Sequence, residues 1–242
     1  MIPVDIFLFD LDGTLIDSKR DIANAVHHVQ KAFHHSLDSE EKIGSFIGDG
    51  IGLLIERALP HASAENHKKA VLMMKDYYRE HCVDHTIVYP GVREMLDHFS
   101  HKKMAIVTNK PERISNRILK NLTLDHYFPV IIGGDTLSQK KPQPEPLLEA
   151  IRLLRAESRE QKAEIKKPSL KKYSSTLPSA LASLSSPIVV MVGDSQNDIH
   201  AGRAAGLLTC GIQSNIGNPD ELRKSKPDFL ISTLSELIRL FN

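Results

Sequence analysis

Residues 6–16 of the chain read Ile-Phe-Leu-Phe-Asp-Leu-Asp-Gly-Thr-Leu-Ile, an apolar run that ends in two acidic residues and a glycine. The run has the length and composition of a buried strand, so Asp10 and Asp12 lie where that strand is expected to end and a loop to begin. Gly13 permits a sharp bend directly after them, which allows one pocket to use both carboxylates. A plain polar turn, in which Asp and Gly are common, is the alternative interpretation.

The composition is that of an ordinary globular protein, with 41% hydrophobic and 25% charged residues among 242. This length allows one large domain or two unequal ones. The net charge of +1 predicts no bulk attraction to nucleic acid or to an anionic membrane. Cys82 and Cys210 lie far apart without a CxxC spacing, so we expect neither a disulfide framework nor a zinc site.

The sequence carries no pattern of secretion or membrane insertion. Asp5 and Asp10 interrupt the apolar stretch near the N-terminus, which therefore does not resemble a signal sequence. No apolar run approaches the roughly 20 residues that a membrane-spanning helix needs. We expect a cytoplasmic protein; its oligomeric state is not indicated by the sequence.

Strand-like and helix-like segments alternate from residue 88 onward. Strands are expected at 104–107, 130–132, 188–192, 209–212 and 229–231, and helices at 92–99, 112–122, 147–154 and 198–205. The alternation predicts βαβ units and therefore an α/β fold, a Rossmann-like, mostly parallel sheet covered by helices on both faces.

Residues 17–85 have a different character. Apolar residues recur there at helical spacing, as at Ile22, Val26 and Val29, and glycines punctuate the middle of the segment. We expect a small all-helical domain at 17–85, inserted into an α/β core domain made of 1–16 and 86–242.

The stretch 156–186 departs from this rhythm because it is rich in lysine and serine and poor in apolar periodicity. A loop of this length is uncommon inside a compact domain. We interpret it as a flexible insertion within the core, with a little helix at either end. Its basic residues form a solvated charged run or contact an acidic partner.

Acids, a hydroxyl and an amide stand directly after three of the expected strands: Asp10 and Asp12, Thr108 and Asn109, and Asp194. The carboxyl ends of parallel strands lie along one edge of a sheet, and ligands bind there at the point where the strand order reverses. Topology therefore brings these residues together. The loop that contains Lys141 leaves the strand at 130–132 and can reach the same crevice.

These residue types favour phosphoryl transfer. Carboxylate oxygens and a main-chain carbonyl suit a hard octahedral cation such as Mg²⁺, which keeps waters that a substrate phosphate can replace. Thr108, Asn109 and Lys141 offer hydrogen bonds and positive charge to an anion. Because acids bind phosphate only through a cation, the set indicates metal-assisted phosphoryl transfer rather than sugar hydrolysis by a carboxylate pair.

Four motifs resemble those of the haloacid dehalogenase (HAD) superfamily in their expected order: Asp10-Leu11-Asp12-Gly13-Thr14-Leu15, Thr108-Asn109-Lys110, Lys141-Pro142-Gln143-Pro144 and Gly193-Asp194-Ser195-Gln196-Asn197-Asp198. The match covers nearly the whole chain apart from 156–186. Further segments resemble the phosphoglycolate phosphatase branch, namely Asp17-Ser18, Tyr89-Pro90-Gly91-Val92, Thr108-Asn109-Lys110-Pro111 and Gly133-Gly134-Asp135-Thr136. The resemblance implies the HAD fold with a small helical cap domain.

The resemblance also implies roles for the acids. Asp10 would be the nucleophile that forms an aspartyl-phosphate. Asp12 would be the general acid that protonates the leaving alkoxide and then activates the water that releases phosphate. Mg²⁺ would be held by the Asp10 carboxylate, the carbonyl oxygen of Asp12 and Asp194.

The resemblance assigns the remaining motif residues around the phosphoryl group. The substrate would be bound by the second motif, that is by Thr108, Asn109 and Lys110. Lys141 would neutralise the phosphoryl group and Asp10. Ser195 and Asp198 would lie behind the metal ligands and position the metal or Lys141. For Asp198, capping of the following helix is the alternative interpretation.

The inserted helices resemble the family's cap, which would close over the crevice and read the leaving group. The turn Gly48-Asp49-Gly50 is the candidate for substrate contact through Asp49 and Gly50, and a plain connection between helices is the alternative. Where the branch commonly carries Gly-Asn-Gly, this chain has an acidic Asp49, which is unfavourable for a carboxylate-bearing substrate.

The sequence therefore predicts a Mg²⁺-dependent phosphatase that acts on a small phosphorylated metabolite, with 2-phosphoglycolate as the leading substrate. A sugar-phosphate phosphatase, a nucleotidase or a pyrophosphatase would use the same site. A phosphosugar mutase would share the nucleophile but return the phosphoryl group to the substrate. A binding protein without activity would need no nucleophile, and a dehalogenase would not need the second aspartate and the metal acid.

Overall fold

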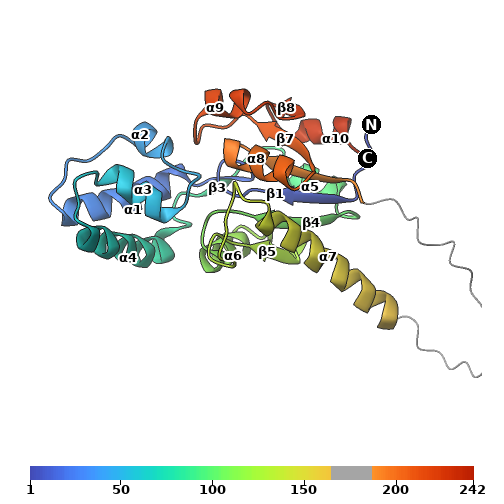
Figure 1. Ribbon diagram of the computed structural model, residues 1–242, viewed down its shortest axis with the longest axis horizontal. Helices are drawn as coiled ribbons and strands as arrows, with labels where there is room; N and C mark the ends of the chain where they lie inside the picture. Colours follow the sequence, from blue (N-terminus) through green and yellow to red (C-terminus); the bar gives the residue numbers. More distant parts are fainter. Residues whose placement is uncertain (165–186) are drawn as a thin grey trace, which may run out of the picture.

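The computed structural model describes residues 1–164 and 187–242, which form a part built around a sheet and a part made of helices (Figure 1). Six parallel strands make the sheet in the order β5-β4-β1-β6-β7-β8. Their bounds are Ile6–Phe9 (β1), Lys103–Val107 (β4), Val130–Ile132 (β5), Val189–Gly193 (β6), Leu208–Ile212 (β7) and Phe229–Ile231 (β8). The predicted α/β fold with a parallel sheet is confirmed.

Helices cover both faces of this sheet. They are α5 (Val92–His98), α6 (Glu112–Asn121), α7 (Glu145–Glu164), α8 (Gln196–Ala204), α9 (Pro219–Lys224) and α10 (Leu237–Leu240), with 3-10 turns at Asp125–Tyr127 and Leu234–Glu236. Successive side chains of β1 point to opposite faces. Phe7 packs on Phe99, the residue directly after α5, with 4.6 Å between ring centroids. Leu8, on the other face, shares an apolar cluster with Leu147 of α7. Burial on both faces explains the unbroken apolar run of β1.

The helical part consists of α1 (Lys19–Ala32), α2 (Glu40–Gly44), α3 (Ile51–Ala58) and α4 (Ala64–His81). Helix α1 packs against α2 and α4, and α3 packs against α4. The spaced apolar residues Ile22, Val26 and Val29 are buried, as their helical periodicity predicts. The all-helical character expected for this segment is confirmed, and we call these four helices the cap.

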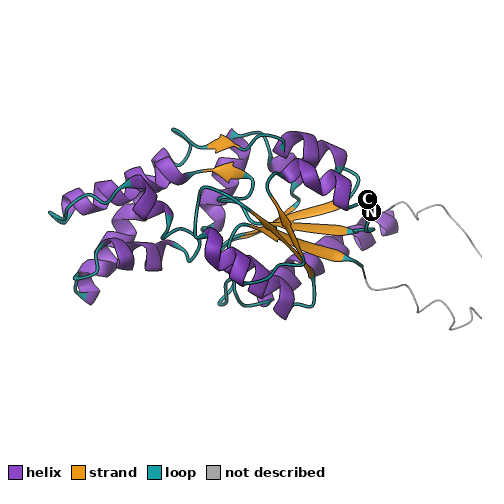
Figure 2. Cartoon of the chain, turned by 90° about the horizontal axis from the view of Figure 1, so that it is seen from above, coloured by secondary structure: helices purple, strands orange, loops and turns teal. Residues whose placement is uncertain are grey.

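A two-stranded antiparallel ribbon joins the cap to the sheet (Figure 2). It pairs β2 (Ile16–Asp17) with β3 (Ile87–Val88), where the chain leaves the sheet part and returns to it. The buried carboxylate of Asp21 accepts hydrogen bonds of 2.9–3.0 Å from the backbone N–H groups of His85 and Thr86. This ribbon lies close to the boundaries expected near residues 16 and 86, and the division into two domains stays a prediction.

Helix α7 is longer than the helix predicted at 147–154, because it begins at Glu145 and ends at Glu164. Figure 1 shows it projecting beyond the sheet. The flexible insertion predicted at 156–186 therefore overlaps the end of this helix, and residues 165–186 lie outside the described part of the chain.

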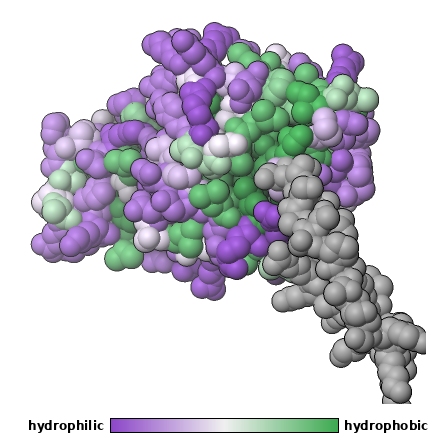
Figure 3. Space-filling view, turned by 45° about the vertical axis from the view of Figure 1, so that its right-hand side comes forward, coloured by the Kyte–Doolittle hydropathy of each residue, from purple (hydrophilic) through white to green (hydrophobic). Residues whose placement is uncertain are grey.

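The surface differs between the two parts of the molecule. Figure 3 shows hydrophilic residues over most of the cap and a hydrophobic area on the sheet part beside the grey segment. Exposed large apolar side chains of the sheet part are Leu148, Ile188 and Leu230. Among the helices of residues 1–164 and 187–242, none has the length and apolar character that crossing a bilayer requires.

Candidate active site

The loops after three neighbouring strands meet at one edge of the sheet. Asp10 follows β1, Thr108 follows β4 and Asp194 follows β6, and β1 lies between the other two strands. From β1 the chain continues on one side through β4 and β5, and later on the other side through β6, β7 and β8, so the strand order reverses here. Such switch points form the ligand crevices of open α/β sheets. All three side chains are buried.

The buried side chain of Lys141 contacts the loop after β1, the end of β4 and helix α8. Its Nζ lies 2.9 Å from Oδ1 of Asp10 and 2.6 Å from Oδ1 of Asp198, and it donates a hydrogen bond of 2.6 Å to the carbonyl of Val107. Burial alone would lower the pKa of Lys141, but the charges of Asp10 and Asp198 outweigh it, so the pKa is raised. The side chain is therefore a fixed positive charge beside Asp10.

Asp194 lies directly against the loop of the first motif. Gly13 has φ of +79°, and a Cβ at this position would lie 2.0 Å from Oδ2 of Asp194, so glycine is required both for the turn and for the close approach. The hydroxyl of Ser214 donates a hydrogen bond of 2.8 Å to Oδ2 of Asp194, and that of Thr14 donates one of 3.4 Å to Oδ1.

Three buried carboxyl groups, those of Asp10, Asp194 and Asp198, each place an oxygen within 4.8 Å of the others. Burial, and then the charges of Asp10 and Asp198, raise the pKa of Asp194 well above its ordinary range. Burial also raises the pKa of Asp198, although Lys141 opposes this shift. The cluster thus concentrates more negative charge than Lys141 balances. Its oxygen ligands and its charge fit a hard divalent cation.

Asp198 contacts both Lys141 and Ser195 at the start of α8. Its Oδ1 pairs with Lys141, while its Oδ2 accepts hydrogen bonds from the backbone N–H of Ser195 at 3.0 Å and from the Ser195 hydroxyl at 2.7 Å. The bond from the Ser195 N–H is one half of a capping box at the start of α8. Because both of its oxygens are engaged, Asp198 positions Lys141, and Asp10 and Asp194 are better placed to hold a cation.

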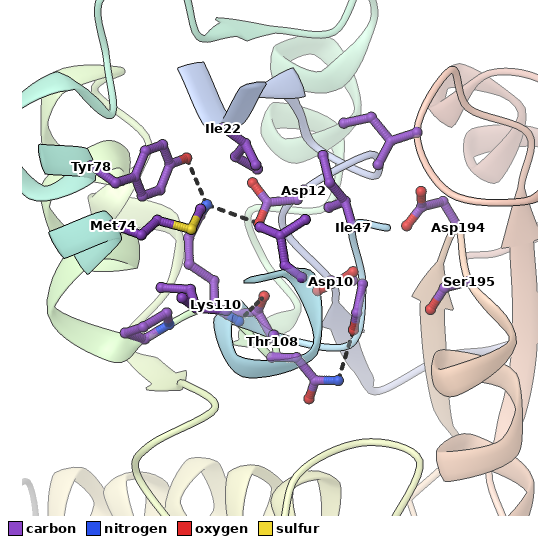
Figure 4. A pocket seen from close by; sticks show the side chains of 17 residues that line it. Asp10, Asp12, Ile22, Ile47, Met74, Tyr78, Thr108, Lys110, Asp194 and Ser195 are labelled. Carbon is purple, nitrogen blue, oxygen red and sulfur yellow. Dashed lines mark hydrogen bonds and ion pairs between the residues drawn. The ribbon is translucent and has the colours of Figure 1, made fainter. Parts of the chain in front are cut away.

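Asp12 is held on both carboxylate oxygens. The hydroxyl of Ser18 donates a short hydrogen bond to Oδ1, and Nζ of Lys110 lies 3.0 Å from Oδ2. Lys110 also donates a hydrogen bond of 2.7 Å to the phenolic oxygen of Tyr78, which belongs to the cap helix α4. Figure 4 shows Lys110 between Asp12 and Tyr78. Lys110 therefore lies at the junction of cap and sheet.

Asn109 links the second motif to the cap and to the third motif. Its Nδ2 donates hydrogen bonds of 2.9 Å to the carbonyls of Gly48 and Lys141. Its buried Oδ1 has no hydrogen-bond partner among the described residues. The hydroxyl of Thr108 accepts a bond of 3.2 Å from the backbone N–H of Lys110 and keeps its own proton for another acceptor.

The turn Gly48-Asp49-Gly50 is fastened to the sheet part. Oδ1 of Asp49 accepts a hydrogen bond of 2.7 Å from Asn197, and its Oδ2 lies 2.6 Å from the guanidinium of Arg57. Nζ of Lys140 donates a short hydrogen bond to the carbonyl of Asp49. Gly48 and Gly50 line the pocket described next, whereas Asp49 is not among its lining residues.

A pocket lies between the cap and the carboxyl ends of the strands. Its floor contains Asp10, Asp12, Thr108 and Asp194. The cap contributes a wall that is mostly apolar, made of Ile22, Ile47, Ile51, Leu54 and Met74. Lys110 and Tyr78 are the polar groups beside this wall (Figure 4). Because three of the four floor residues are acids, an anionic group of a ligand would be held at the floor through a bound cation, with the rest of the ligand toward the cap.

A family model described as haloacid dehalogenase-like hydrolase matches residues 7–162, and a second, described as HAD-hydrolase-like, matches residues 139–237. The chain belongs to the haloacid dehalogenase-like hydrolases. A phosphoglycolate phosphatase of Chromobacterium violaceum is 34% identical over 239 residues, covering 96% of this chain and 94% of the relative. A phosphoglycolate phosphatase of Aquifex aeolicus is 32% identical, with 98% and 96% covered.

Solved structures agree with this assignment. A crystal structure from Haemophilus somnus, described as a predicted phosphoglycolate phosphatase, has a TM-score of 0.80 and 26% identity, with 99% of each chain covered. A haloacid dehalogenase-like hydrolase from Bacteroides fragilis shares the fold, with a TM-score of 0.78, 24% identity and 97% and 99% of the chains covered. The resemblance predicted from the sequence, the HAD fold and the class of HAD-type phosphatase are confirmed.

The haloacid dehalogenase motifs all reach one site, but some contacts around them were not predicted. Ser18, Tyr78 and Ser214 hold Asp12, Lys110 and Asp194 through their hydroxyl groups. Tyr78 fits the apolar period of its helix and is read as a core residue. Ser214 follows the end of β7 at the same sheet edge, and this position is the signal that could have identified it.

Proposed function

We propose that the protein is a Mg²⁺-dependent phosphomonoester hydrolase that acts on a small phosphorylated metabolite, 2-phosphoglycolate, through an aspartyl-phosphate at Asp10. The observation that carries the proposal is the buried contact of Asp10 with Lys141, beside Asp194 and Thr108 in one crevice. A binding module has no need of this costly arrangement of buried charges. We keep the expectation that the enzyme is cytoplasmic and takes neither nucleic acid nor membrane as its partner.

In the first step, an oxygen of the Asp10 carboxylate attacks phosphorus, and the bond between phosphorus and the ester oxygen breaks. The electron pair of that bond stays on the ester oxygen, which takes a proton from Asp12. Lys141 compensates the charge of Asp10 and of the phosphoryl oxygens, while Thr108 and Lys110 donate hydrogen bonds to the substrate. Both N–H groups of the Asn109 amide are engaged by the carbonyls of Gly48 and Lys141, so Asn109 orients the loop that carries Thr108 and Lys110 toward the substrate. Lys110 has three N–H donors, of which Asp12 and Tyr78 engage two.

In the second step, Asp12 accepts a proton from water as that water attacks phosphorus, and phosphate leaves Asp10. Mg²⁺ bound by Asp10, Asp194 and the main-chain carbonyl of Asp12 would supply Lewis-acid stabilisation of the phosphoryl oxygens. Ser195 and Asp198 act indirectly, since they hold Lys141 and the start of α8 in place.

The pocket wall supports a compact leaving group. The several hydroxyls of a sugar need hydrogen-bond partners, and Ile47, Ile51 and Leu54 offer none through their side chains. The single carboxylate of glycolate would be bound by Lys110, which lines the pocket beside this wall. The acidic Asp49 was expected to oppose a carboxylate, but its charge is paired with Arg57. The relatives named phosphoglycolate phosphatase add support for this substrate. Gly50, which lines the pocket, and Asp49 beside it in the turn remain our proposed contacts of the cap with the substrate.

The test is a panel of phosphate esters offered with Mg²⁺ or with EDTA: 2-phosphoglycolate, hexose phosphates, nucleoside monophosphates and pyrophosphate. We expect the highest kcat/KM with 2-phosphoglycolate, and loss of turnover in EDTA. Asp10→Asn should lower kcat by about 10⁴-fold or more, because the nucleophile is lost. Asp76→Asn, an exposed acid of the cap, is the matched control and should keep full activity.

Three results would contradict the proposal. They are metal-independent turnover, undiminished turnover of Asp10→Asn, and formation of an isomeric phosphate without release of free phosphate. The last result would identify a mutase.

A further inference from the structure

Lys110 is a buried cation whose contacts join three segments of the chain. Its side chain is 5% exposed, and its Nζ contacts Oδ2 of Asp12 at 3.0 Å and the phenolic oxygen of Tyr78 at 2.7 Å. The ammonium also lies over the Tyr78 ring, 4.4 Å from its centroid. A cation held both by a hydroxyl and by a ring face has little freedom to move.

The partners of Lys110 come from different parts of the molecule. Asp12 lies on the loop after β1, Lys110 precedes α6 in the loop after β4, and Tyr78 lies on α4 of the cap. Tyr78 is 1% exposed, so packing in the cap fixes its ring. The phenol of Tyr78 and the ammonium of Lys110 therefore link the position of the cap to the position of one Asp12 oxygen.

We propose that Tyr78 and Lys110 are positioning residues that set the orientation of Asp12 for proton transfer to the leaving group. Asp12 is then correctly oriented as the general acid only when the cap is docked on the sheet part. Ser18 holds the other oxygen of Asp12 from the beginning of α1. Both carboxylate oxygens are therefore oriented by groups at the cap or at its junction. The inference rests on the proposed function, in which Asp12 protonates the ester oxygen as its bond to phosphorus breaks.

The proposal has a chemical signature that distinguishes it from a structural role. An alkyl phosphate releases a strongly basic alkoxide, which needs the proton of Asp12. p-Nitrophenyl phosphate releases a phenolate that is stable without protonation, so its transfer to Asp10 gains little from a well-placed acid. The value of kcat/KM reports the steps up to phosphoryl transfer and is independent of the later attack by water.

The test compares kcat/KM for the best alkyl phosphate of the panel with kcat/KM for p-nitrophenyl phosphate. In Tyr78→Phe, which keeps the ring but loses the hydroxyl, we expect about a tenfold loss with the alkyl ester, carried by kcat rather than KM. The loss with p-nitrophenyl phosphate should stay below about twofold. Asp12→Asn should show the same selectivity with a larger loss.

Four further variants keep the result interpretable. Tyr77→Phe removes a phenolic hydroxyl from the same helix, where Tyr77 stacks between His28 and His81 outside the pocket, and it should leave both substrates unaffected. In the Asp12→Asn background, Tyr78→Phe should cause no further loss, because its effect passes through Asp12. Lys110→Arg, which keeps the charge, should retain more activity on the alkyl ester than Lys110→Met.

The outcomes separate the two proposals. Equal losses for both substrates, no loss in Tyr78→Phe, or losses that multiply in the double variant would overturn the positioning role and leave the phosphatase proposal intact. A wild-type protein that hydrolyses no phosphate ester would overturn the proposed function and this inference with it. Thermal unfolding of each variant verifies that the compared proteins are folded.

Discussion

Lys141 illustrates how a single side chain organises the site. Its ammonium lies between the carboxylates of Asp10 and Asp198 and is itself buried. Since its pKa is raised above the ordinary value of 10.5, its contribution to stability is complete below pH 10.5 and is lost only as pH rises through the raised pKa. The charge beside the nucleophile is therefore constant over the neutral range.

Lys141→Met tests this role at the scale of the residue. The change leaves Asp10 and Asp198 without a counter-charge, so we expect the free energy of unfolding to fall by about 3–5 kcal/mol. Phosphatase activity should be lost with it. Denaturant titration measures the first effect, with Lys69→Met as the control, because Lys69 pairs with Glu65 on the surface. Equal unfolding midpoints for the two variants would contradict the prediction.

Individual residues also show where sequence reasoning ends. Asp10, Thr108, Lys141 and Asp194 were predicted to meet because strand ends and parallel topology determine their place. The partner of Lys110 was not predicted, since Tyr78 lies on α4 at a position that fits an ordinary core residue. A contact between two side chains of different elements depends on how those elements pack, and no spacing within one segment encodes it.

At the scale of elements, burial decided which strands could be predicted. Strands β1, β4 and β6 are covered on both faces and therefore read as apolar runs. The ribbon strands β2 and β3 have two residues each, too few for any period. Helices α9 and α10 were missed for a similar reason, because six and four residues form barely one or two turns.

The turn Gly48-Asp49-Gly50 is the element that docks the cap onto the sheet part. Asn109 and Lys140 donate hydrogen bonds to it from two different loops, and Asn197 donates one from the first turn of α8. Each such bond contributes about 1 kcal/mol, so their number rather than their individual strength holds the cap. This arrangement argues for Asp49 as a cap contact whose effect does not depend on the substrate.

Asp49→Ala tests that argument. Loss of the contacts to Asn197 and Arg57 should loosen α3, so we expect faster amide exchange there and a KM that rises several-fold for all substrates alike. Hydrogen exchange read by mass spectrometry and steady-state kinetics measure the two effects. Glu65→Ala, which removes an exposed acid paired with Lys69 elsewhere in the cap, is the control. A KM change confined to one substrate would instead show that Asp49 reads the substrate.

Considered as a whole, the molecule gathers its buried negative charge where the sheet and the cap meet. Burial and the charges of Asp10 and Asp198 raise the pKa of Asp194 far above its ordinary value of 3.8. The folded protein without a cation thus binds a proton more tightly than the unfolded chain does. The contribution of Asp194 to stability is therefore greatest below that ordinary value and is lost as pH rises through the raised pKa.

A bound divalent cation should reverse this loss, because it replaces the proton at the carboxylates. We therefore expect the rise in Tm caused by Mg²⁺ to grow as pH increases from the ordinary carboxyl pKa of 3.8 through the raised pKa of Asp194. At a Mg²⁺ concentration of about 100 Kd, the gain of about 2.7 kcal/mol corresponds to roughly 5–10 °C. Thermal unfolding in Mg²⁺ and in EDTA measures it. Asp194→Asn should remove both the Mg²⁺ effect and the pH-dependent loss, since the amide carries no charge. A Mg²⁺ shift that is equal at all pH values, or that persists in Asp194→Asn, would place the cation away from this cluster.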